Sequence, residues 1–139
     1  MILEQMPVDD DLMTDAEMRV MSDFLGLSGP QLATVMGVHD RTVRRWENSE
    51  TGIPDGVAED FEALEARTAD AVGRAVEEIL AANGEVRVAT YASDEDFWAA
   101  EPHMRPLPAR WDRMVVARVA QEVPGLRIVF RGRTGDRRA

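Results

Sequence analysis

The chain has 139 residues and a formal net charge of −10, with 26 acidic residues against 16 arginines and no lysine. This charge argues against a protein that coats nucleic acid without regard to sequence, because the field of the whole molecule repels phosphate. The absence of cysteine excludes disulfides, thiolate metal sites and a cysteine nucleophile, and no apolar run reaches membrane-spanning length, so we expect a cytoplasmic protein with no membrane partner.

The first element is predicted after an N-terminal extension. Residues 1–12 show no sustained periodicity and end in an acidic cluster, so we expect them to be flexible. Thr14 and Glu17 then form a capping-box pattern, and apolar residues follow at helical spacing. The pattern predicts a helix that runs to about Leu25, with Gly26 as its stop.

Two short helices joined by a turn are predicted next. Ser28 is a good N-cap for the first of them, and Gln31 stands three residues further on, where it completes a capping box. Gly37 supplies a left-handed turn. The second helix is expected to begin at residue 39 or 40 and to end near Asn48.

The second of these helices has two unlike faces. Val43 and Trp46 are predicted to point inward, and charged residues occupy the outward positions. A recognition helix offers the residues of its first turns to base edges, and arginine bidentate to guanine is the commonest specific contact. We therefore predict that bases are read by Asp40, Arg41, Arg44 and Arg45. Contacts to DNA phosphates are predicted for Ser28, His39, Thr42 and Asn48. The alternative is that the three arginines form only a solvated face.

A long helix is predicted between residues 55 and 83. Apolar residues recur at steps of three and four from Val57 to Leu80, and Asn83-Gly84 is a strong stop. Either one helix of about 28 residues or two helices bent near Gly73 would fit this pattern. The opposite face is acidic and is expected to lie in water; it consists of Glu59, Asp60, Glu62, Glu65, Asp70, Glu77 and Glu78.

The remaining residues predict a small α+β module. Residues 85–91 and 126–131 alternate with period two and indicate strands. Between them, Ser93 begins a short helix and Pro108 a longer one. Two strands cannot form a large sheet alone, so the module is expected to pack on the long helix or to pair across a dimer. Its large apolar residues are expected to form a core or a dimer interface rather than a ligand pocket. Those predicted for the dimer interface are Tyr91, Phe97, Trp98, Trp111, Val115, Ile128 and Phe130.

Several of these residues together resemble a known family. The chain contains Leu32-Ala33, Gly37-Val38, Thr42-Val43 and Trp46-Glu47-Asn48 at spacings similar to those of the XRE, or lambda-repressor-like, helix-turn-helix family. The resemblance implies base reading by Asp40, Arg41 and Arg45, with Arg44 at the edge of the helix.

A narrower resemblance extends into the second half of the chain. Ile53-Pro54-Asp55-Gly56-Val57, the long helix, a strand containing Tyr91 and a tryptophan-bearing helix resemble the YdiL-like proteins, which include a branch of the anti-CRISPR-associated (Aca) repressors. This resemblance covers about residues 13–123. It implies a small dimeric autorepressor that binds an inverted repeat in a phage operon promoter, with the C-terminal region forming the homodimer.

We therefore predict a mainly α protein with a small α+β part. A lambda-repressor-like helix-turn-helix bundle with its long following helix spans residues 13–83, a C-terminal dimerisation module spans residues 84–131, and residues 132–139 form a basic tail. The predicted function is sequence-specific transcriptional repression by a homodimer on double-stranded operator DNA. No catalytic site, metal or cofactor is expected, because His39 and His103 lack metal-site spacing and a chain without lysine has no Gly-Lys-Ser/Thr phosphate loop.

Three alternatives stay open at this point. The protein could be an antitoxin-like interaction module whose C-terminal half neutralises a partner and which also binds its own promoter. Its helix-turn-helix could also serve only a structural purpose. RNA is a further candidate partner, although no stacking aromatic is predicted on the exposed face.

Overall fold

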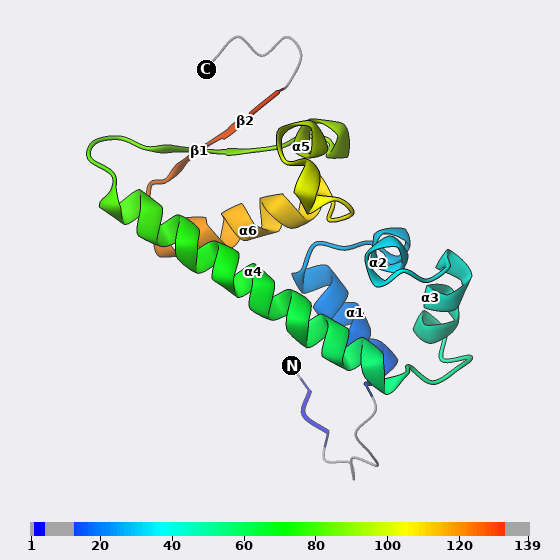
Figure 1. Cartoon of the computed structure of the whole chain (residues 1–139). Helices are drawn as coiled ribbons and strands as arrows, with labels where there is room; N and C mark the ends of the chain where they lie inside the picture. The colour runs from blue at the N-terminus through cyan, green and yellow to red at the C-terminus, as the bar shows by residue number, and fades with distance from the viewer. Residues whose placement is uncertain (1, 5–12, 133–139) are drawn as a thin grey trace.

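The computed structural model describes residues 2–4 and 13–132 (Figure 1). Most of the predicted N-terminal extension and of the basic tail therefore lies outside the described residues. The elements in chain order are α1 (Asp15–Phe24), α2 (Gly29–Met36), α3 (Asp40–Glu47), α4 (Asp55–Ala81), β1 (Arg87–Thr90), α5 (Asp94–Ala100), the 3-10 helix η1 (Pro102–Met104), α6 (Ala109–Glu122) and β2 (Arg127–Phe130). A mainly helical protein with two short strands confirms the predicted fold class.

The first helices begin and end where local chemistry predicts. The Thr14 hydroxyl accepts a hydrogen bond from the Glu17 N–H at 3.0 Å and caps α1. Ser28 and Gln31 form the complete capping box of α2, with each side chain accepting from the other residue's N–H. Gly37 ends α2 in the left-handed conformation, with a φ of 71°. These satisfied backbone groups set where the short helices begin and end.

The long helix α4 is the element on which the rest of the protein packs. It is one continuous helix of 27 residues, so the alternative of two helices bent near Gly73 is wrong. Its buried stripe is Val57, Phe61, Leu64, Thr68 and Val72. In Figure 1, the bundle of α1, α2 and α3 lies beside the first half of α4, and α6 runs along its second half. One helix thus supports both ends of the molecule.

A single core joins the bundle of α1, α2 and α3 to the C-terminal module. Its fully buried side chains include Met18 of α1, Val43 of α3, Phe61 of α4 and Trp111 of α6. Because these residues come from both halves of the sequence, burial of apolar surface holds the two halves against each other.

The two strands form a parallel pair rather than a hairpin. Val88 of β1 stands opposite Ile128 of β2, and the residues between the strands form the α5–η1–α6 crossover. Parallel strands need such a crossover, because a short turn can join only antiparallel strands. The module packs on α4 through α6, which is one of the two arrangements that the sequence left open.

One residue of the acidic α4 face does not lie in water as predicted. The Glu65 side chain is largely covered, and both of its carboxylate oxygens accept hydrogen bonds from Arg118 of α6, at 2.8 and 3.2 Å. The prediction for Glu65 was wrong because a stripe of acids along one helix does not reveal where another helix will cross it.

Candidate nucleic-acid interface

The candidate site is the outer surface of α3. On its inner face, Val43 and Trp46 are 1% and 5% exposed, as the sequence predicts, and they pack in the shared core. Small Ala33 of α2 is also buried, where α2 and α3 approach each other. Because α3 has only eight residues, it is not stable as an isolated helix. This packing therefore both stabilises α3 and determines its direction.

The outer face of α3 carries uncompensated positive charge. Asp40, Arg41, Arg44 and Arg45 are all exposed. None of the three arginines forms an ion pair or side-chain hydrogen bond with any residue in the described part of the chain. Their guanidinium groups are therefore available for phosphates or for the acceptor atoms of guanine. The four predicted base-reading residues lie together on one accessible surface.

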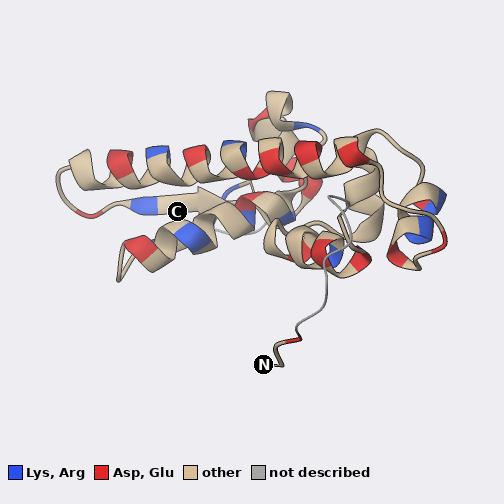
Figure 2. Ribbon diagram, turned by 90° about the horizontal axis from the view of Figure 1, so that it is seen from below, with Lys and Arg blue, Asp and Glu red and all other residues tan. Residues whose placement is uncertain are grey.

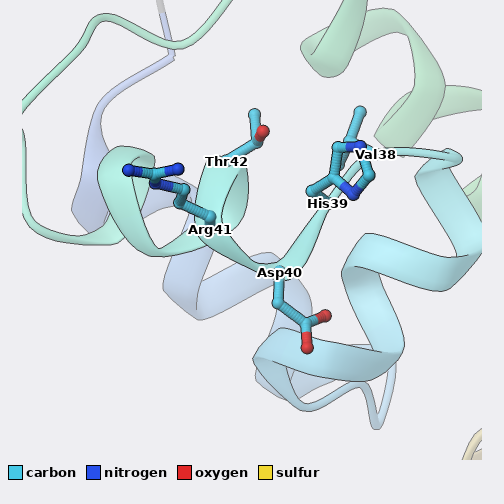
Figure 3. A pocket seen from close by; sticks show the side chains of 5 residues that line it. All are labelled: Val38, His39, Asp40, Arg41 and Thr42. Carbon is cyan, nitrogen blue, oxygen red and sulfur yellow. The ribbon is translucent and has the colours of Figure 1, made fainter.

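A surface hollow marks the beginning of α3. It is lined by Val38, His39, Asp40, Arg41 and Thr42. Figure 3 shows that Arg41 and Asp40 extend in different directions from this turn, while His39 and Thr42 project on the other side from Asp40. The Asp40 carboxylate repels phosphate, so a base donor such as cytosine N4 suits it better.

The predicted phosphate contacts surround this face. The His39 imidazole makes no capping hydrogen bond although His39 occupies the N-cap of α3, and Asn48 is exposed at the other end of the helix. The Ser28 hydroxyl accepts the Gln31 N–H at 3.2 Å, which leaves its own proton able to donate to a phosphate oxygen. Their roles toward phosphate stay predictions.

Two polar contacts that the sequence did not reveal hold the end of α3 against α1. Glu47 pairs with Arg19 at 3.8 Å, and the Ser49 hydroxyl donates to the Asp15 carboxylate at 2.5 Å. The hydrogen bond from Ser49, followed by one from the Ala16 N–H, lowers the pKa of the exposed Asp15. In the sequence, Glu47 stands out only as part of the Trp46-Glu47-Asn48 motif, and nothing links positions 15 and 49.

The exposed face of α4 is mostly acidic. Figure 2 shows blue arginine segments on the short helix at one end of the molecule and repeated red segments along α4. The exposed acids of α4 are Glu59, Asp60, Glu62, Asp70, Glu77 and Glu78. A polyanion would therefore be attracted to a small part of the surface and repelled by much of the rest.

The family is shown by a comparison with known proteins. A family model described as Aca2/YdiL-like matches residues 13–125 of this chain. The chain belongs to the Aca2/YdiL-like family. Membership confirms the resemblance drawn from the sequence and suggests an anti-CRISPR-associated regulator. Among curated proteins, no sequence matches the chain.

For this Aca2/YdiL-like protein, the residues predicted at a dimer interface fall into two groups. Tyr91, Phe97, Trp111 and Val115 are buried within one chain, and the rings of Tyr91 and Phe97 are 5.2 Å apart between centroids. Burial within one chain favours a core role for these four residues over a place in the dimer interface. Trp98 is half-buried: its indole N–H donates to the Leu107 carbonyl at 2.8 Å. The exposed members of the set are Ile128 and Phe130, both on β2.

The described part of the chain lacks two further classes of feature. No group of three or more histidine, aspartate or glutamate side chains there could hold a metal ion. No described helix combines the length and the apolar character needed to cross a membrane.

Proposed function

We propose that this Aca2/YdiL-like protein is a sequence-specific DNA-binding repressor that inserts α3 into the major groove. The observation that carries the proposal is the exposed surface of Arg41, Arg44 and Arg45, which makes no local ion pair and stands on the second helix of a helix-turn-helix. Bidentate arginine contacts to guanine each contribute about 1–3 kcal/mol of discrimination. An acidic protein that groups exposed arginines on one short helix suits specific rather than indiscriminate binding.

We further propose that the protein acts as a homodimer on an inverted repeat. Ile128 and Phe130 on β2 are 46% and 37% exposed, and they border an apolar groove that also includes Val116 and Ala117 of α6. A second copy would cover this surface, and a two-stranded sheet gains stability from such burial. A two-fold dimer presents two α3 helices, which matches the symmetry of an inverted repeat.

The family and this geometry support the proposal that the protein represses transcription. A dimer bound at an inverted repeat in a promoter blocks access of RNA polymerase. The repressor would act in the cytoplasm on the promoter of its own operon, and membership of the Aca2/YdiL-like family supports a regulatory role.

DNA binding is tested with the duplex upstream of the protein's own gene and with a random-sequence duplex pool. We expect the purified protein to enrich an inverted repeat from the pool and to bind its upstream DNA more tightly than a scrambled duplex of equal composition. Equal affinity for the two duplexes, together with no enrichment from the pool, would falsify sequence-specific binding.

Dimerisation is tested by sedimentation equilibrium of the wild type and of Ile128→Glu. The wild type is expected to sediment as a dimer and the variant as a folded monomer, because a carboxylate would be buried without a partner in the interface. Leu80→Glu is the control, since Leu80 is an exposed apolar residue at the end of α4, outside the groove. A monomeric wild type would exclude the homodimer.

A further inference from the structure

In addition to the shared apolar core, one side chain of the C-terminal module contacts both α4 and α1. Arg118 lies on α6, and its guanidinium donates two hydrogen bonds to Glu65 of α4. The same guanidinium stacks over the ring of Phe24 at the end of α1, with its Cζ atom 4.8 Å from the ring centroid. Arg118 thus contacts both α4 and α1. These contacts oppose a rotation of the bundle against α6.

A close backbone contact lies about two turns before this arginine on α6. A Cβ atom on Gly26, in the turn between α1 and α2, would stand 2.9 Å from the Arg110 carbonyl oxygen in the first turn of α6. Only a residue without a side chain lets these two backbones approach so closely. The turn that leads into the recognition unit therefore rests directly on the module that carries β2.

The chemistry of the contact suits positioning. The Arg118 and Glu65 side chains are 21% and 29% exposed, so water screens their pairing only in part. A bidentate guanidinium–carboxylate pair fixes direction as well as distance, and the ring of Phe24 covers one face of the guanidinium. By contrast, Arg74 and Asp70 pair through one nitrogen and one oxygen within α4 alone, and both side chains are well exposed.

We propose that Arg118 is a positioning residue that locks the helix-turn-helix bundle onto the C-terminal module, so that the dimer selects operators by the spacing of their half-sites. The inference rests on the proposed function, because it requires a dimer that binds two half-sites. Inserting one base pair rotates one half-site against the other by about 35° and moves it by about 3.4 Å. A dimer with fixed recognition helices cannot follow this change, whereas a dimer with loosened bundles can.

The test uses the inverted repeat that the wild-type protein selects from a random duplex pool, with one or two base pairs inserted or removed between its half-sites. For each base pair inserted or removed, the affinity of the wild type is expected to fall about tenfold or more. The affinity of Arg118→Met is expected to fall about threefold or less. Phe24→Ala should broaden the spacing profile in the same direction; since Phe24 is 43% exposed, this variant serves if Arg118→Met does not fold. Arg118→Lys should restore part of the wild-type profile, and Arg74→Met should keep all of it.

A second readout does not depend on DNA. The chain has no cysteine, so cysteines introduced at Arg44 and Gln121 can carry two spin labels, one on α3 and one on α6. Diluting labelled chains with unlabelled protein restricts the measured distance to one protomer. We expect a narrow distance distribution in the otherwise wild-type background and a broader one with Arg118→Met or Phe24→Ala.

The outcomes separate this inference from the proposed function. Failure to enrich any sequence from the pool would count against the repressor, while the distance distributions would still report on the contact. Enrichment of an inverted repeat together with unchanged spacing profiles in both variants, or unchanged distance distributions, would overturn the positioning role of Arg118 alone.

Discussion

The indole N–H of Trp111 donates a hydrogen bond to Thr68 Oγ1 over 3.0 Å, between two side chains that are almost completely buried. The Thr68 hydroxyl in turn donates to the Leu64 carbonyl of its own helix at 2.6 Å. This chain of hydrogen bonds satisfies the one polar group of a large aromatic side chain at the contact between α4 and α6.

Thr68→Val should weaken this contact without changing the shape of the core. Valine fills the same space but cannot accept the indole proton, and an unsatisfied buried donor costs about 1–3 kcal/mol. Urea denaturation should show that loss. Thr34→Val is the matched control, because the exposed Thr34 hydroxyl makes only the local hydrogen bond to the Pro30 carbonyl. Equal stabilities for the two variants would contradict the role of the Trp111 hydrogen bond.

Arg41→Ala and Arg45→Ala should each weaken operator binding with the fold intact. Loss of one bidentate contact costs about 1–3 kcal/mol, or roughly 5- to 150-fold in affinity. Fluorescence anisotropy on the selected duplex measures the affinity, and circular dichroism checks the fold. Arg74→Ala on α4 removes the same charge elsewhere and should change affinity little. Equal losses for all three variants would point to net charge rather than base reading.

Ser28 allows the helix cap and the phosphate contact to be separated. Ser28→Ala removes the acceptor of the Gln31 N–H and should lower stability by about 0.5–2 kcal/mol. Ser28→Asp keeps an N-cap acceptor but adds a negative charge, so thermal denaturation should find it close to the wild type while its affinity for DNA falls. Undiminished affinity in the aspartate variant would remove Ser28 from the phosphate contacts.

Gly26 and Gly37 form a matched pair for measuring the approach of the α1–α2 turn to α6. Both have a φ of 71°, so alanine introduces similar backbone strain of about 1–2 kcal/mol at either position. At Gly26 the new Cβ also meets the Arg110 carbonyl at 2.9 Å, whereas at Gly37 it meets nothing within 4 Å. Chemical denaturation should therefore find Gly26→Ala clearly less stable than Gly37→Ala. A Gly26→Ala variant more stable than Gly37→Ala would show that the α1–α2 turn moves away from α6 at little cost in free energy.

The stability of the module should depend on the ionisation of Asp112. Burial raises the pKa of the Asp112 carboxyl above 3.8, repulsion from Glu101 adds to this, and the hydrogen bond from the Thr90 hydroxyl opposes it. The folded state therefore holds this proton more tightly than the unfolded chain does. The free energy of unfolding falls as the pH rises from the unfolded pKa through the folded pKa.

Asp112→Asn removes this titration and keeps an acceptor for Thr90. We expect the variant to gain stability relative to the wild type as the pH rises from about 3.5 to 7, measured by urea midpoints. Asp15→Asn is a control of opposite sign: the pKa of Asp15 is lowered, so its charged form contributes stability that is lost as the pH falls through the folded pKa. Parallel pH profiles for the two variants would refute the assignment to Asp112.

The sequence alone determined the local structure of α2 and α3. Ser28 with Gln31 and the left-handed Gly37 act through neighbouring backbone groups, so their effect can be read from spacing. Likewise, the period of the apolar residues was sufficient to orient Val43 and Trp46 inward and the arginines of α3 outward. The candidate site was predictable because all of its charged residues belong to one short helix.

Only the tertiary structure decided how the two halves of the chain meet. Arg118 contacts Glu65, which is 53 residues away in the sequence, and Phe24, which is further away still. The two strands pair in parallel and are connected by the α5–η1–α6 crossover. Such contacts depend on the directions in which packed helices leave the core, and periodicity along one element carries no information about its neighbours. For the same reason, sequence could name Trp111 as core or interface, whereas its burial against Thr68 of α4 identifies it as core.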